Sequence, residues 1–152
     1  MSMLTRAVFG ISGLLLVLLS GGTAAAAEEP VFSTRAGAIR GYDPVAYFAQ
    51  GKPVKGDPRF SLEYQGATWR FASAENRDRF AAEPGRYAPQ YGGYCAWAVS
   101  QGYTASVVPD AWRIVNNKLY LNYSTGVQRR WSQDVPGNIA KADANWPAVL
   151  SK

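Results

Sequence analysis

Histidine is absent from this chain of 152 residues, and cysteine occurs only once, as Cys95. Without an imidazole, the sequence excludes Ser-His-Asp and Cys-His catalysis and every metal site that needs a histidine ligand. A single cysteine cannot form an intramolecular disulfide, and one thiolate without histidine cannot close a tetrahedral zinc site. From the sequence we therefore assign no catalytic residue, no metal ligand and no cofactor.

Clustered positive charge is also lacking. The formal net charge is +5, and Arg129-Arg130 is the only adjacent basic pair. A surface that binds nucleic acid usually concentrates Lys and Arg on one face, so we do not expect a nucleic-acid partner. What the chain does have is apolar content, since 47% of its residues are hydrophobic and 13% are aromatic. This composition predicts a folded domain with a real core rather than a disordered chain.

The N-terminal residues have the three parts of a secretory signal peptide. Arg6 supplies a positive charge, residues 7–19 are nearly all apolar, and a tract of small residues, 24–27, follows. The apolar run is shorter than the roughly 20 residues that a membrane-spanning helix needs. We therefore predict a signal peptide over residues 1–26, cleaved after Ala26 or Ala27, and an exported protein, periplasmic or secreted, with no membrane span after cleavage.

The first half of the remaining chain predicts an arm, a short helix and a hairpin. Residues 27–40 form a weakly specified N-terminal arm that could end in a short strand. Asp43 followed by Pro44 is typical of a helix start, and predicts a helix that ends by Gly51. Alternating apolar residues over 60–65 and 68–71 predict a hairpin around Gly66, and Ser73 can cap a helix over residues 74–83.

The second half predicts a further hairpin between helices. Residues 95–100 favour a short helix, and strands 112–115 and 119–123 flank a turn at Asn116-Asn117. Two C-terminal helices, containing Val127 to Trp131 and Ile139 to Trp146, should be separated near Pro136-Gly137. The fold class is therefore α+β: a single small domain, over residues 41–150, of short antiparallel hairpins packed against several helices.

Two separated stretches carry a family resemblance. Residues 41–48 read Gly-Tyr-Asp-Pro-Val-Ala-Tyr-Phe, and residues 64–73 read Tyr-Gln-Gly-Ala-Thr-Trp-Arg-Phe-Ala-Ser, followed by Asn76, Phe80, Pro84 and Tyr87. This pattern resembles the YHS domain family. Blocks at 91–96, 119–123 and 145–147 extend the resemblance, toward an exported bacterial subfamily, to about residues 37–150.

The resemblance implies a metal site that this chain does not reproduce. The best-understood members of the family bind soft metal ions through cysteines and occur beside copper-transport machinery. The three matching positions here hold Ala46, Ala72 and Asn76. Thiolates are the ligands that select copper(I), and a methyl group cannot replace them. The resemblance therefore implies the fold of the family without its cysteine site.

Four residues are our candidates for ligand binding: Asp43, Tyr47, Tyr91 and Cys95. Each also has a purely structural interpretation. Asp43 can cap the helix that follows it. Buried tyrosine hydroxyls often brace loops by bonding to backbone groups, and Cys95 can be a small buried hydrophobe between apolar neighbours.

These observations lead to one leading functional hypothesis and two alternatives. The leading hypothesis is a non-catalytic binding module of the cell envelope, which recognises a small ligand or another envelope protein. The first alternative is a periplasmic copper-handling protein that uses Cys95 with oxygen ligands such as Asp43 and tyrosines. The second is an enzyme that depends on Cys95 as a nucleophile.

Overall fold

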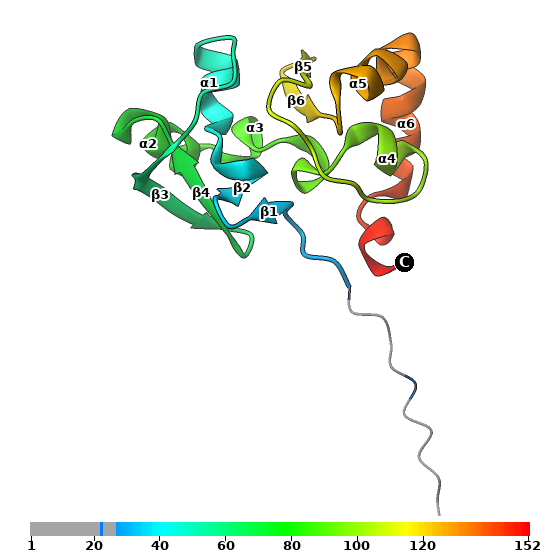
Figure 1. The fold of residues 1–152 in the computed structure, drawn as a ribbon, viewed down its shortest axis with the longest axis horizontal. Coiled ribbons are helices and arrows are strands. Elements are labelled where there is room, and N and C mark those ends of the chain that lie inside the picture. Colours follow the sequence, from blue (N-terminus) through cyan, green and yellow to red (C-terminus); the bar gives the residue numbers. More distant parts are fainter. Residues whose placement is uncertain (1–21, 23–26) are drawn as a thin grey trace, which may run out of the picture.

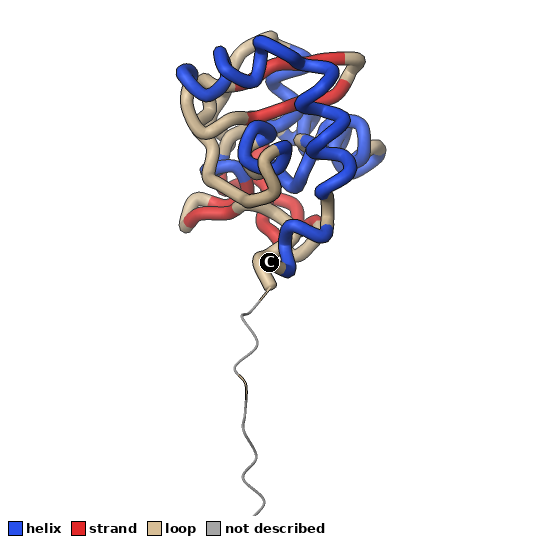
Figure 2. Tube along the Cα trace, turned by 90° about the vertical axis from the view of Figure 1, so that its right-hand side faces the viewer, coloured by secondary structure: helices blue, strands red, loops and turns tan. Residues whose placement is uncertain are grey.

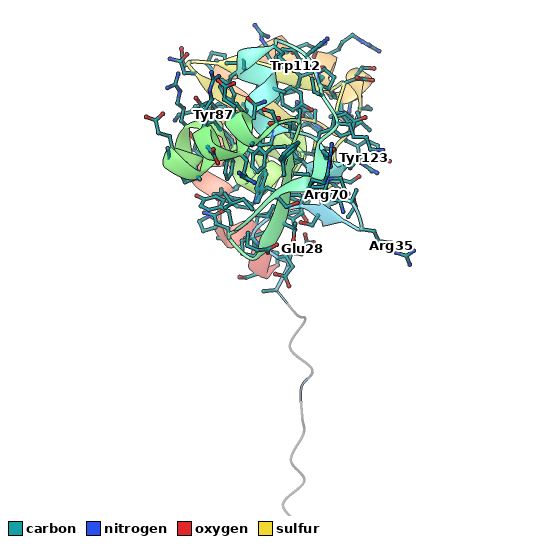
Figure 3. All side chains as sticks on the ribbon, turned by 90° about the vertical axis from the view of Figure 1, so that its left-hand side faces the viewer. Glu28, Arg35, Arg70, Tyr87, Trp112 and Tyr123 are labelled. Atoms are coloured by element: carbon teal, nitrogen blue, oxygen red, sulfur yellow. The ribbon has the colours of Figure 1, made fainter. Side chains whose placement is uncertain are left out.

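The computed structural model describes Gly22 and residues 27–152. The predicted signal peptide therefore lies, except for Gly22, outside the described residues. Within the described part of the chain, none of the helices has the length and apolar character needed to cross a membrane. Glu28, near the start of the described arm, and Trp112 lie at opposite ends of the folded domain in the view of Figure 3.

The N-terminal arm is part of the folded domain. It contains β1 (Ser33–Thr34), β2 (Gly37–Ala38) and the 3₁₀ turn η1 (Ile39–Gly41). Val31, Ala38 and Ile39 are buried in the core. Backbone bonds fix the arm at two more points, because Phe32 N donates to Gly92 O at 2.9 Å and Glu28 N donates to Leu150 O at 2.8 Å. The start of the arm and the C-terminus consequently lie side by side (Figure 2).

The first half of the domain follows its local sequence signals. Asp43 caps the first helix and Ser73 caps the second, as predicted. In the second strand of the hairpin, Ala67, Trp69 and Phe71 are buried while Thr68 and Arg70 point outward, which is the predicted alternation. The elements are α1 (Pro44–Ala49), β3 (Asp57–Tyr64), β4 (Ala67–Phe71), α2 (Ala74–Ala82) and α3 (Pro84–Tyr87).

The second half contains the predicted hairpin and helices with shifted boundaries. Its elements are η2 (Gln90–Gly93), α4 (Ala96–Ser100), β5 (Trp112–Val115), β6 (Lys118–Leu121), α5 (Thr125–Trp131), η3 (Ser132–Asp134), α6 (Val135–Asn145) and η4 (Ala148–Ser151). The second strand ends at Leu121, two residues earlier than predicted. The C-terminal helices are separated at Ser132–Asp134 rather than near Pro136-Gly137. Pro136 lies in the first turn of α6, where its missing N–H has no helical partner to lose.

The α+β fold class is confirmed, and its core consists of two clusters. In Figure 1 the β3–β4 hairpin with α1 and α2 lies on one side, and α4, α5 and α6 lie on the other. The first cluster centres on Trp69, Phe71 and Phe80, and the second contains Tyr120 and Trp131. Strand β6 contributes to both, because Leu119 and Leu121 face the first cluster and Tyr120 faces the second.

Candidate functional site

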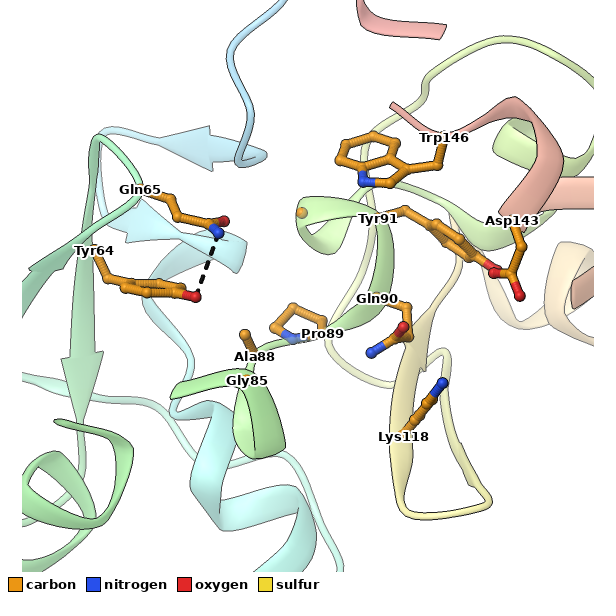
Figure 4. A pocket seen from close by; sticks show the side chains of 11 residues that line it. Tyr64, Gln65, Gly85, Ala88, Pro89, Gln90, Tyr91, Lys118, Asp143 and Trp146 are labelled. Atoms are coloured by element: carbon orange, nitrogen blue, oxygen red, sulfur yellow. Dashed lines mark hydrogen bonds between the residues drawn. The ribbon is translucent and has the colours of Figure 1, made fainter. Parts of the chain in front are cut away.

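A polar cleft with a volume of about 420 Å³ opens between the β3–β4 hairpin and α6. We call it the Tyr91 cleft. In Figure 4 the hairpin turn lies on one side, the start of β6 lies below, and Tyr91, Asp143 and Trp146 lie on the other side. It is lined by Tyr64, Gln65, Gly85, Ala88, Pro89, Gln90, Tyr91, Gly92, Lys118, Asp143 and Trp146.

Special backbone conformations shape two walls of the Tyr91 cleft. Gln65 and Gly66 both have positive φ, at 50° and 75°, which makes the tight turn between β3 and β4. Gly92 has a φ of 61°, and a Cβ atom at this position would collide with the carbonyl oxygen of Pro30. Only glycine therefore allows the N-terminal arm to cross directly behind the cleft.

Tyr91 is held in the cleft by both its backbone and its side chain. It has φ 59° and ψ 37°, a left-handed conformation that is uncommon for a residue with a side chain. Its hydroxyl donates a hydrogen bond to Asp143 Oδ1 at 2.8 Å, and its ring meets the Trp146 ring edge-on at 6.0 Å. Burial, and then the bond to Asp143, raise the pKa of Tyr91 well above its usual range. Tyr91 therefore stays protonated and acts as a hydrogen-bond donor.

Charged and amide side chains complete the cleft lining. Lys118 and Asp143 bring opposite charges, and neither belongs to the four ion pairs found among the described residues. Gln65 and Gln90 add amide groups, each with donors and acceptors. The lining can thus satisfy a ligand that carries several polar groups, and it contains no cysteine, serine or threonine that could act as a nucleophile.

Asp43 lies elsewhere, at the buried junction of α1 and α2. Its side chain is 0% exposed, and Oδ1 accepts from Val45 N and Ala46 N at 2.8 and 3.2 Å. Oδ2 accepts from Ala72 N at 2.8 Å and from Asn76 Nδ2 at 2.7 Å. We call Asp43, Ala46, Ala72 and Asn76 the Asp43 centre. The three positions that the family resemblance singled out thus converge on one carboxylate, whose bonds are all made within the protein.

Tyr47 and Cys95 are also engaged internally. Tyr47 OH donates to Pro109 O at 3.0 Å, and burial raises the pKa of Tyr47 far above its usual range. Cys95 is 1% exposed, and its Sγ accepts from Tyr123 N at 3.3 Å and from Ala98 N at 3.5 Å. Burial raises the pKa of the Cys95 thiol, although the neighbouring backbone N–H groups oppose this shift.

The structure does not bring the four predicted residues into one site. Tyr91 lines the cleft, Asp43 caps α1, Tyr47 braces the Pro109 loop and Cys95 caps α4. Sequence reasoning missed Gln65, Gln90, Lys118 and Asp143, which reach the cleft from four separate segments. The only local signal was weak: Asp143 and Trp146 are three residues apart, and so share one side of the predicted C-terminal helix.

Comparison with known proteins supports the family resemblance over part of the chain. The YHS domain family model matches residues 45–91, from α1 to Tyr91 in η2. The matched stretch includes Ala46, Ala72 and Asn76 and accounts for less than half of the chain. Searches of curated proteins and of solved structures find no match to this chain.

Proposed function

We propose that the protein is a non-catalytic binding module of the cell envelope, and that it recognises a small polar ligand in the Tyr91 cleft. The observation that carries this proposal is the constrained state of Tyr91. Residues held in sparsely populated backbone conformations cluster at ligand sites, because such sites need fixed groups. Tyr91 combines positive φ, 5% exposure and a fixed hydrogen-bond acceptor, Asp143, in the lining of a polar cleft.

The chemistry of the cleft favours binding over catalysis. A general base needs a pKa near the working pH, whereas the Tyr91 pKa is raised far above it. Lys118 and Asp143 have opposite charges and no ion-pair partner in the described part of the chain, so they can pair with charges on a ligand instead. The ligand class that fits is a small molecule with both hydrogen-bonding and charged groups.

The two alternatives from the sequence have less support. Among residues 27–152 no group of three or more His, Cys, Asp or Glu side chains could hold a metal ion. The Asp43 carboxylate already accepts four hydrogen bonds, and those partners include no thiol. A nucleophilic thiol needs a lowered pKa, whereas burial raises that of Cys95.

The proposed export rests on the signal-peptide pattern of residues 1–26. Among the described residues, Glu28 follows the expected cleavage sites directly, and its backbone N bonds to Leu150 O. N-terminal sequencing of protein from the periplasm should therefore begin at Ala27 or Glu28. An intact Met1 in the membrane fraction would contradict export.

Native mass spectrometry of protein purified from its own periplasm tests ligand binding. We expect a non-covalent organic adduct on the natural protein, and its loss in Lys118→Gln and in Asp143→Asn. The matched control is Lys141→Gln, since Lys141 is an exposed residue of α6 outside the cleft. An adduct that persists equally in all three variants would place the ligand elsewhere, and a natural protein without any adduct would contradict the proposal.

A further inference from the structure

A second cavity, of about 270 Å³, lies between α4, α5 and the segment after β6. It shares no lining residue with the Tyr91 cleft. Tyr103 and Tyr123, 52% and 54% exposed, are the only exposed large hydrophobic residues among those the structure describes, and both line this cavity. We call it the Tyr123 groove; its lining is Cys95, Trp97, Tyr103, Ala105, Tyr123, Val127 and Arg130.

The walls of the groove are tied to one another around the start of α4. Tyr123 N donates to Cys95 Sγ at 3.3 Å, and Cys95 N donates to Ala105 O at 3.0 Å. Tyr103 N donates to Ala98 O at 3.1 Å. Three wall segments are thereby fixed to α4 before any ligand arrives, and such preorganisation lowers the entropic cost of binding.

Asn122 fixes a further wall. Its Oδ1 accepts from Trp97 N at 3.0 Å and lies 3.5 Å from Cys95 Sγ. Asn122 is 0% exposed, so this amide holds the Trp97 backbone from inside the protein. The backbone that carries the Trp97 ring is therefore held by a buried contact.

Arg130 gives the groove a positive charge. Its guanidinium lies 5.8 Å from the centre of the Trp97 ring, and it belongs to none of the ion pairs found in residues 27–152. No Asp or Glu lines the groove. Three aromatic side chains and one arginine without a carboxylate partner are complementary to a planar aromatic group that carries a negative charge.

We propose that the Tyr123 groove binds a small aromatic anion. The aromatic ring of this ligand packs against Trp97, Tyr103 and Tyr123. Its negative group, such as a carboxylate, accepts hydrogen bonds from Arg130. This site is separate from the Tyr91 cleft and does not depend on the function proposed for it. Cys95 lies at the base of the groove as a structural cap and has no chemical role in the proposal.

An NMR titration of the mature protein with 4-hydroxybenzoate tests the proposal. Shifts should concentrate at the Trp97 indole N–H and the Tyr123 amide. 4-Hydroxybenzyl alcohol keeps the ring but lacks the charge, and we expect it to bind at least tenfold more weakly. Equal affinity for the acid and the alcohol, or shifts confined to other residues, would overturn the proposal.

Variants test the contributions of Arg130 and of the aromatic wall separately. Arg130→Gln should weaken binding of the acid at least fivefold and leave binding of the alcohol within twofold. Tyr103→Ala should weaken binding of both the acid and the alcohol, because it removes a ring contact.

Arg129→Gln is the matched control on the same helix, outside the groove lining, and should change acid binding less than twofold. An equal loss in Arg129→Gln and Arg130→Gln would show non-specific charge attraction and would overturn the assignment; unchanged amide spectra elsewhere confirm that each variant is folded.

Discussion

The Asp43 centre and the Tyr91 cleft each contain a carboxylate, but the two carboxylates are in opposite situations. Asp43 is 0% exposed and accepts four hydrogen bonds from its own chain. Asp143 is exposed, accepts one bond from Tyr91, and shares its cleft with an unpaired lysine. A carboxylate with every partner supplied internally stabilises the fold, whereas one with spare acceptor capacity beside a cavity can serve a ligand.

Removal of the Asp43 carboxylate should have the largest effect on stability. Asp43→Ala leaves three backbone N–H groups and the Asn76 amide without their acceptor inside the protein. We expect the free energy of unfolding to fall by about 3–5 kcal/mol, measured by urea denaturation. Asp110→Ala, an exposed carboxylate, is the control and should change it by less than about 0.5 kcal/mol. A loss below about 1 kcal/mol at Asp43 would end its interpretation as a structural centre.

The Cys95 position should show the next largest effect. Cys95→Ser replaces a buried thiol with a more strongly polar hydroxyl and should cost on the order of 1–3 kcal/mol. In the native protein the thiol should react slowly with a thiol reagent at pH 8, because it is buried and its pKa is raised. Labelling as fast as that of free cysteine would show that this position belongs with the ligand sites.

Local sequence signals predicted the elements around the Asp43 centre well. Asp43-Pro44, Ser73 and the alternation through Trp69 act within a few residues, so capping and strand faces could be predicted directly. The partners that close the Asp43 centre, at Ala72 and Asn76, were marked only by the family resemblance.

The Tyr91 cleft could not be predicted in the same way. Gln65, Lys118 and Asp143 are exposed polar residues in three distant segments, and only the tertiary fold brings them to one cleft. The break at Ser132–Asp134 was missed for a similar reason, because Pro136-Gly137 looks like an interruption but fits a helix start. Tertiary context decided both features.

Alkaline pH should lower stability through the buried tyrosines. Burial raises the pKa of Tyr47 in the folded protein, so the stabilising effect is complete below the unfolded tyrosine value of about 10 and is lost as pH rises above it. Each such tyrosine contributes at most about 1.4 kcal/mol per pH unit to this loss. In Tyr47→Phe, the decrease in unfolding free energy between pH 9 and pH 11 should be smaller. An identical decrease in the variant would show that Tyr47 ionises normally in the folded protein.

The smallest stability effect is expected in the cleft itself. Lys118 is exposed, and in the described structure its side chain makes no ion pair and no hydrogen bond. Lys118→Gln should therefore change the free energy of unfolding by less than about 0.5 kcal/mol, measured by urea denaturation. A loss above about 1 kcal/mol would mean that Lys118 supports the fold, and the contrast with Asp43 would disappear.

The position of strand β6 between the two core clusters determines how the domain unfolds. Its alternate residues serve the two core clusters, so neither cluster can open without disturbing a strand that the other also needs. The chain should for this reason unfold as one cooperative unit, although Figure 1 shows its elements in two groups. Amide hydrogen exchange in α2 and in α6 should then report the same opening free energy, since both depend on the loss of this shared strand.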